Sequence, residues 1–129
     1  MQIQVGQIAT TTRTFTQDDF NRFAKLSGDD NPIHVDPDFA ARSRFGKTVS
    51  HGMLLYGVLC GALNKHFPGA EQVEQELMFP TPTFVGEEIT VRLQVKEVDD
   101  ANRTARLETI ITRPNGDVAL QGQTLVRWQ

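Results

Sequence analysis

The 129-residue sequence contains few of the features that assign a protein to a class at once. It has a single cysteine, Cys60, so no disulfide can form within the chain. Its three histidines, at positions 34, 51 and 66, lack the paired ligand spacing of zinc and iron sites, and we predict no metal site. It has no transmembrane run, targeting peptide, low-complexity tract or internal repeat, so we expect a cytoplasmic protein.

Positive charge is also scarce, because 13 Lys and Arg residues stand against 16 Asp and Glu residues, for a net charge of −3. A protein that binds nucleic acid through a broad basic face has the opposite balance, so we predict no nucleic-acid partner. A small anionic ligand needs only a local cluster of positive charge. The length suits one domain with a substantial core, which we predict over residues 1–129.

The most apolar stretch, Met53–Leu63, organises the rest of the chain. It contains no charge and no polar face at helical spacing, which is typical of a helix surrounded by protein. A helix of this length rises about 16 Å, too little for a hydrocarbon core of about 30 Å, so we predict no membrane partner. Gly57 and Gly61 share one face, which favours close approach of another backbone. The helix begins at His51-Gly52, where free N–H groups point outward.

Shorter elements precede this helix. Apolar residues within positions 3–9 weakly indicate a strand. Thr16 can cap a helix over residues 17–27, which Gly28 ends. Residues 27–34 are predicted to form a loop, because Pro32 disfavours helical backbone at the residue before it. A second short helix is predicted to start at Asp36-Pro37.

After residue 69 the hydrophobic period changes from 3.6 to 2, which is typical of strands. Apolar residues alternate in four runs, at 73–79, 89–95, 105–111 and 118–128, and Asn115-Gly116 is a hairpin signal. We predict an antiparallel meander that curves around the central helix, which is an α+β fold. One chain leaves the far side of the helix uncovered, so we predict a homodimer with twofold symmetry.

Asp29, Asn31 and His34 lie within one short segment and can form a catalytic site. A carboxylate can accept a proton from a water that an imidazole orients, and the Asn31 amide can orient either group. If the central helix starts beside this segment, the Gly52 N–H can bind an oxyanion. These groups suit addition of water to a double bond conjugated with a carbonyl. The alternative is that Asp29 and Asn31 are ordinary turn residues and that His34 only satisfies a backbone carbonyl.

Three segments resemble the signatures of the MaoC-like dehydratases, the family of (R)-specific enoyl-CoA hydratases. Residues 27–34 (SGDDNPIH) resemble the hydratase-2 motif, and residues 50–54 (SHGML) resemble the second signature. Residues 84–89 (FVGEEI) resemble the third, with Glu87 in place of the usual Asp. The resemblance covers roughly residues 5–127. It implies the hot-dog fold, in which a curved sheet wraps one long helix.

The resemblance also implies a reaction and the residues that perform it. Asp29 and His34 would activate a water, Asn31 would support their geometry, and the Gly52 N–H would bind the thioester oxygen. The enzyme would be a hydro-lyase that adds water syn to trans-2-enoyl-CoA, giving (3R)-3-hydroxyacyl-CoA, or runs the reverse. It would need no metal and no redox cofactor, and would work as a dimer or a dimer of dimers. The alternatives are a hot-dog thioesterase and a non-catalytic acyl-CoA-binding subunit.

Five further residues are assigned to substrate binding. The second signature implies this role for Ser50, His51 and Met53. From its position alone, His51 also suits a support for the backbone that precedes the helix. Arg44 and Lys47 belong to the densest basic cluster in the chain and are candidates for contacts with the coenzyme A phosphates. The alternative for this cluster is a solvated charged surface.

Overall fold

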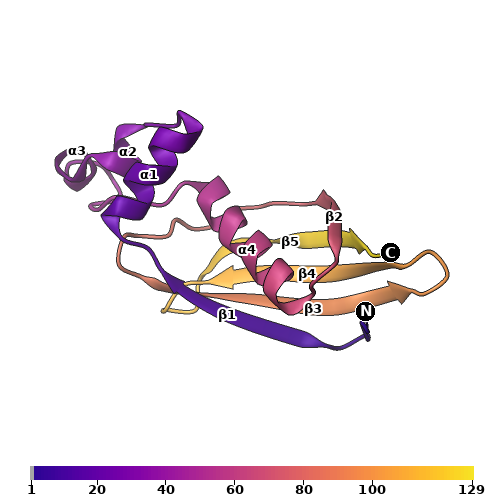
Figure 1. The fold of residues 1–129 in the computed structure, drawn as a ribbon. Coiled ribbons are helices and arrows are strands. Elements are labelled where there is room, and N and C mark those ends of the chain that lie inside the picture. Colours follow the sequence, from indigo (N-terminus) through magenta and orange to yellow (C-terminus); the bar gives the residue numbers. More distant parts are fainter. Residues whose placement is uncertain (1) are drawn as a thin grey trace.

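The structure is a computed structural model that describes residues 2–129. These residues form a five-stranded sheet with one long helix on its face and three shorter helices at one end (Figure 1), which confirms the predicted α+β class. Along the chain the elements are β1 (Ile8–Thr14), α1 (Gln17–Ser27), α2 (Pro32–Val35), α3 (Pro37–Ala41), α4 (Gly52–His66), β2 (Glu71–Gln75), β3 (Glu88–Asp99), β4 (Thr104–Thr112) and β5 (Val118–Arg127).

The sheet is antiparallel throughout, with the strand order β1-β3-β4-β5-β2. β3, β4 and β5 form the predicted meander. The turn between β4 and β5 is closed by the Arg113 N–H, which donates to the Asp117 carbonyl at 2.8 Å, and Gly116 supplies its left-handed backbone with φ 90°. The prediction that the run at 73–79 opens this meander is wrong. β2 pairs with β5 instead, and therefore lies at the opposite edge of the sheet from β1.

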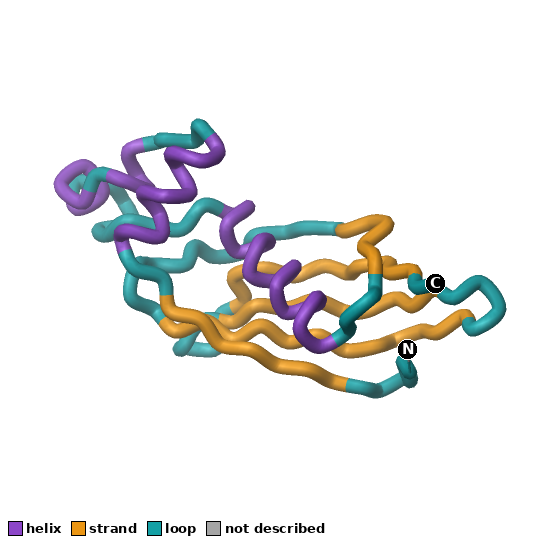
Figure 2. Tube along the Cα trace, viewed as in Figure 1, coloured by secondary structure: helices purple, strands orange, loops and turns teal. Residues whose placement is uncertain are grey.

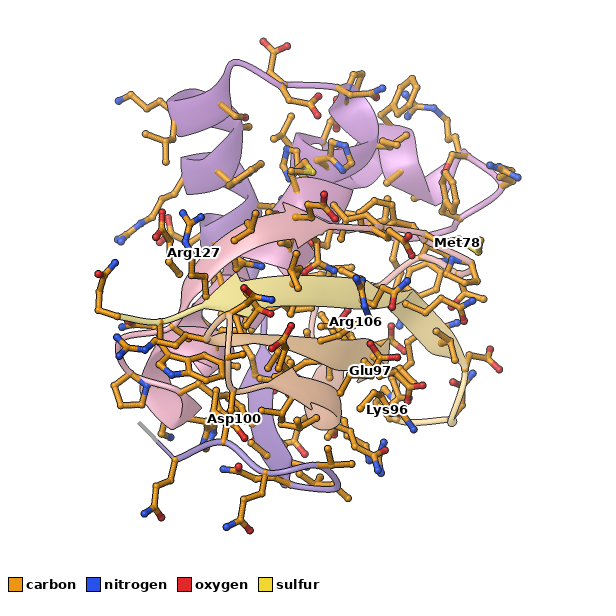
Figure 3. All side chains as sticks on the ribbon, turned by 90° about the vertical axis from the view of Figure 1, so that its right-hand side faces the viewer. Met78, Lys96, Glu97, Asp100, Arg106 and Arg127 are labelled. Atoms are coloured by element: carbon orange, nitrogen blue, oxygen red, sulfur yellow. The ribbon has the colours of Figure 1, made fainter. Side chains whose placement is uncertain are left out.

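The two faces of the sheet differ as the alternating pattern predicts. One face is apolar and forms the core. Several outward side chains are charged and pair across strands, as Arg106 does with Glu97 at 3.8 Å (Figure 3). The inward side chains of β3 and β4 are almost completely buried: Ile89, Val91, Leu93, Val95, Ala105, Leu107, Thr109 and Ile111.

α4 lies across the apolar face of the sheet (Figures 1 and 2). Its other side is open, because Met53 is 52% exposed and a Cβ added at Gly57 or Gly61 would meet no atom within 4 Å. The prediction that another backbone approaches these glycines is therefore wrong within one chain. Among residues 2–129, no helix has the length and apolar character needed to cross a membrane. α4 contributes four buried apolar side chains to the core: Leu55, Leu59, Ala62 and Leu63.

The segment before α4 agrees with the sequence prediction in part. β1 begins later than the strand predicted at residues 3–9, because the chain turns at Gly6, which has φ 91°. α1 has the predicted ends. Thr16 Oγ1 accepts the Asp19 N–H at 3.2 Å, and Gly28 ends the helix with φ 82°. α1, α2 and α3 gather beyond one end of the sheet, close to the first turn of α4 (Figure 2).

Candidate active site

The loop after α1 carries the first of the predicted catalytic residues. The Asp29 N–H donates to Ser27 Oγ at 3.1 Å, which holds the start of the loop against the end of α1. Asn31 Oδ1 accepts the Ile33 N–H at 3.2 Å, so Asn31 caps a single turn of helix, α2. The prediction of a loop throughout residues 27–34 is therefore wrong at its end. His34 lies on this turn of helix rather than on a loop.

The His34 ring is oriented by the backbone that leads into α4. His34 Nδ1–H donates to the Val49 carbonyl at 2.7 Å, since a carbonyl oxygen can only accept. With the proton on Nδ1, the lone pair of the neutral imidazole is on Nε2. An Asp29 carboxylate oxygen and one ring nitrogen each of His34 and His51 lie within 4.8 Å of one another. The structure therefore places Asp29 beside His34, as the sequence predicted, and the Asp29 side chain is exposed.

His51 lies beneath this pair. Its ring stacks on the His34 ring with centroids 3.8 Å apart, and its Nε2–H donates to the Asp29 carbonyl at 2.8 Å. Burial lowers the pKa of His51, a backbone bond to Asp29 opposes this, and the neighbouring His34 lowers it further. His51 is only 2% exposed, and its Nδ1 has no hydrogen-bond partner among the described residues. The prediction that His51 contacts substrate is corrected: its side chain supports the Asp29 backbone and the His34 ring from below.

Asp29, His34 and His51 offer the donor types of a transition-metal site, but their arrangement does not suit one. An imidazole binds a metal through a lone pair in the plane of its ring, at about 2.0–2.1 Å. The two rings are stacked with an interplanar angle of 25°, so their lone pairs run side by side and do not converge on one point. One nitrogen of each ring is already bonded to a backbone carbonyl. The cluster is therefore better suited to a water molecule and proton transfer.

α4 begins directly after His51, and Gly52 is its first residue. The Gly52 N–H has no acceptor within the helix, and the positive end of the helix dipole lies at the same point. A Cβ added at Gly52 would lie 2.9 Å from the nearest ring atom of Phe79, so a side chain at this position would require the Phe79 ring to move. Gly52 and Phe79 line a pocket of about 390 Å³ together with Arg44, Ser50 and Thr83. This pocket gives a ligand access to the start of α4.

The remaining predicted substrate-binding residues divide into two groups. Ser50 and Arg44 line the pocket at Gly52, and the Arg44 guanidinium lies 4.6 Å from the centroid of the Phe45 ring. Lys47 and Met53 are exposed and do not line this pocket. Sequence reasoning missed Phe79, because in the sequence it is one more apolar residue of an alternating run.

The third signature closes a turn beside the site. Glu87 Oε1 accepts the Phe84 N–H at 2.8 Å, and both Glu87 oxygens accept from the Arg113 guanidinium at 3.2 Å. Val49 and Phe84 form an isolated antiparallel bridge, which joins this turn to the segment that holds His34. Glu87 therefore provides the carboxylate of this signature although its side chain is one methylene longer than Asp.

A curved antiparallel sheet with one long helix on its face, and an Asp–His pair beside the first turn of that helix, places the protein among the hot-dog hydratases and dehydratases. The model of the family described as "MaoC like domain" matches residues 2–113, and the chain belongs to this family.

Individual relatives are similar over nearly the whole chain. The (R)-specific enoyl-CoA hydratase of Aeromonas caviae is 36% identical over 127 residues, which are 97% of this chain and 95% of the relative. The 3-hydroxybutyryl-CoA dehydratase of Methylorubrum extorquens is 32% identical over 127 residues, 97% of this chain and 80% of the relative. The solved structure of the (R)-hydratase from A. caviae involved in PHA biosynthesis matches with a TM-score of 0.94 and 36% identity, covering 98% of each chain.

Proposed function

We propose that the protein is an (R)-specific enoyl-CoA hydratase, a hydro-lyase that adds water syn and reversibly to trans-2-enoyl-CoA to give (3R)-3-hydroxyacyl-CoA. One observation supports this most directly. The exposed Asp29 carboxylate lies beside His34, whose ring is tied to Val49 through Nδ1 so that Nε2 keeps a lone pair. The 36% identity to a relative named (R)-specific enoyl-CoA hydratase adds independent support.

The proposed mechanism uses this pair on a single water molecule. His34 Nε2 accepts a hydrogen bond from the water and orients it, while the Asp29 carboxylate accepts a proton as the water oxygen bonds to the β-carbon. The electrons of the double bond move onto the thioester, whose oxygen becomes enolate-like. The Gly52 N–H donates to that oxygen, and the helix dipole stabilises its charge. The α-carbon then takes a proton from the Asp29–His34 pair, which returns to its starting state.

Water and the thioester supply every atom of this reaction, so we propose no metal and no redox cofactor. Arg44, at the pocket beside Gly52, is proposed to bind a coenzyme A phosphate, and Lys47 to add long-range attraction from the same basic segment. Ser50 lines the same pocket and is proposed to contact the thioester arm. A cytoplasmic location stays a prediction from the sequence.

We also propose a homodimer with twofold symmetry, in which a second copy covers the open side of α4. Met53 is 52% exposed there, and a Cβ added at Gly57 or Gly61 would meet no other segment within 4 Å. Small residues allow the backbones of two elements to pack closely. Analytical ultracentrifugation at micromolar concentration is expected to give the mass of two chains. A stable monomer under these conditions would contradict the dimer.

The activity is tested with crotonyl-CoA, by loss of the absorbance of the conjugated thioester and chiral analysis of the product. Asp29→Asn and His34→Ala are each expected to lower kcat by about 10²–10⁴-fold, because the first removes the proton acceptor and the second removes the group that orients the water. Asp30→Asn is the matched control, since Asp30 is the adjacent carboxylate and is exposed, and it should leave kcat unchanged. Full turnover in Asp29→Asn would refute the mechanism.

The same assay separates the two alternatives. A hot-dog thioesterase would release free coenzyme A, which a thiol reagent detects, and would form no 3-hydroxyacyl product. A non-catalytic binding subunit would give a calorimetric binding signal with enoyl-CoA and no change in absorbance. Either result with the wild-type protein would replace the hydratase assignment.

A further inference from the structure

The side-chain amide of Gln17, the first residue of α1, connects three separate segments. Its Nε2 donates to the His34 carbonyl at 2.8 Å and to Asn21 Oδ1 at 3.1 Å, and its Oε1 accepts from Thr48 Oγ1 at 2.6 Å. Both amide hydrogens and the amide oxygen are therefore used. Thr48 is 2% exposed, so its hydroxyl has little access to water as an alternative partner. A side chain with this many partners from other segments is more constrained than a surface residue.

Together with the bonds of His34 to the segment at Val49, these bonds form a closed network on the backbone side of the proposed catalytic imidazole. Gln17 holds the His34 carbonyl at one end and the Thr48 side chain at the other. Thr48 precedes Val49, whose carbonyl accepts from His34 Nδ1 at 2.7 Å, and the Val49 N–H donates to the Ile33 carbonyl at 3.1 Å. The backbone of His34 and the acceptor for its ring are thus held at a fixed separation by one amide.

The need for these hydrogen bonds follows from the size of α2. A single turn of helix is not stable by itself, and its last carbonyls have no partner within the helix. The His34 carbonyl belongs to this group, and Gln17 is the partner that satisfies it. Without Gln17, the turn that carries His34 would be held mainly by the Asn31 cap and by its contacts with the segment at Val49.

We propose that Gln17 and Thr48 are positioning residues for the hydration reaction: together they fix the orientation and the Nδ1–H tautomer of His34. This inference rests on the proposed function for its kinetic consequence, but its structural part stands independently. Neither side chain contacts the reacting atoms. Each acts through the Nδ1–H···Val49 bond, which keeps the Nε2 lone pair available to the water.

Two substitutions test the hydrogen bonds of Gln17 and Thr48 in different ways. Gln17→Met keeps length and helix propensity but removes all three hydrogen bonds, and Thr48→Val removes only the hydroxyl. Each is expected to lower kcat by about 10-fold or more with little change in KM, because small displacements of a catalytic group have large effects on rate. The double variant should be no slower than the slower single variant, because both substitutions disrupt the same hydrogen-bond network.

Two matched controls separate positioning from general destabilisation. Thr48→Ser restores the hydroxyl and should restore kcat to within about twofold of wild type. Asn21→Ala removes the other acceptor of the Gln17 amide and leaves the His34 and Thr48 bonds in place, so it should leave kcat unchanged. Circular dichroism on each variant establishes that it is folded. Should Gln17→Met not fold, the Thr48→Val and Thr48→Ser pair makes the same test.

A second measurement does not depend on activity. Nitrogen-15 spectra of the His34 ring distinguish a protonated from an unprotonated nitrogen, and the wild type should give a protonated Nδ1 and a free Nε2. In Gln17→Met and Thr48→Val both shifts should move toward the average of two tautomers. Unchanged shifts together with unchanged kcat in both variants would overturn the inference. If the wild type hydrates no enoyl-CoA but the nitrogen-15 shifts still change in the two variants, only the proposed function is overturned.

Discussion

The inward side chains of the sheet and the site side chains of the helical segment at residues 16–51 are held in place by different forces. In β3 and β4 the inward side chains are almost all apolar and completely buried, and no particular bond direction is needed to hold them. In the helical segment the bonds between elements are directional, such as His34 Nδ1 to Val49 and His51 Nε2 to Asp29. The proposed chemistry lies in the second region. A proton-transfer site needs fixed directions, which hydrogen bonds define and apolar packing does not.

This contrast predicts that the two regions respond differently to substitution. Changes in the sheet core should alter the free energy of unfolding and leave the turnover of the folded protein intact. Changes behind the site should alter turnover by more than they alter stability.

The largest effect on stability is expected from the sheet. Leu107→Ala removes a side chain that is 0% exposed, and it should lower the free energy of unfolding by about 2–5 kcal/mol through lost burial and the cavity left behind. Urea unfolding measures this change. Glu108→Ala, which faces outward on the same strand, should change it by less than about 1 kcal/mol. A large fall in kcat for folded Leu107→Ala would contradict the expectation that changes in the sheet core leave turnover intact.

A smaller effect is expected at the start of α1. Thr16→Ala removes the side chain that accepts the Asp19 N–H, and should lower the free energy of unfolding by about 1 kcal/mol. Thr10→Ala, on the exposed side of an edge strand, is the control and should have little effect. Because Gln17 follows the cap directly, Thr16→Ala should also lower kcat modestly. Equal stability losses in the two variants would argue against the cap.

The third effect is a pH dependence that originates in the helical segment. Burial lowers the pKa of His51, so the folded protein disfavours the proton that an unfolded histidine takes up below about pH 6.5. The contribution to stability is therefore present above that pH and is lost as pH falls toward the lowered pKa. Urea midpoints measured from pH 8 to pH 5 should fall with pH in the wild type. His51→Gln should flatten this dependence, and an unchanged slope would contradict the assignment to His51.

Much of the fold follows from local signals that the structure confirms. The ends of α1 are set by Thr16 and Gly28, and the β4–β5 hairpin by Asn115-Gly116. The apolar pattern places β1 too early in the chain. The strand itself is mostly threonine and has no apolar alternation, although β-branched residues favour strands. The position of β2 beside β5 could not be predicted, since strand order depends on contacts far apart in the sequence.

The candidate site was predictable to a different extent. The spacing of Asp29 and His34 and the start of α4 predicted which groups meet, and the structure brings Asp29 and His34 together. The local signal for α2 is Asn31 followed by Pro, which is a common helix start. The stacking of His51 on His34 and the bonds of Gln17 to His34 and Thr48 join residues 17 positions or more apart, and no local pattern encodes them.

The contact between Gly52 and Phe79 has a consequence for how the sequence can drift. Since the Phe79 ring fills the space that a side chain at Gly52 would need, Gly52 cannot be replaced unless that ring moves or is made smaller, whereas Phe79 can become smaller by itself. A larger residue at the first becomes acceptable only after a smaller one arises at the second. Laboratory redesign of the pocket at Gly52 should therefore change Phe79 first and Gly52 afterwards.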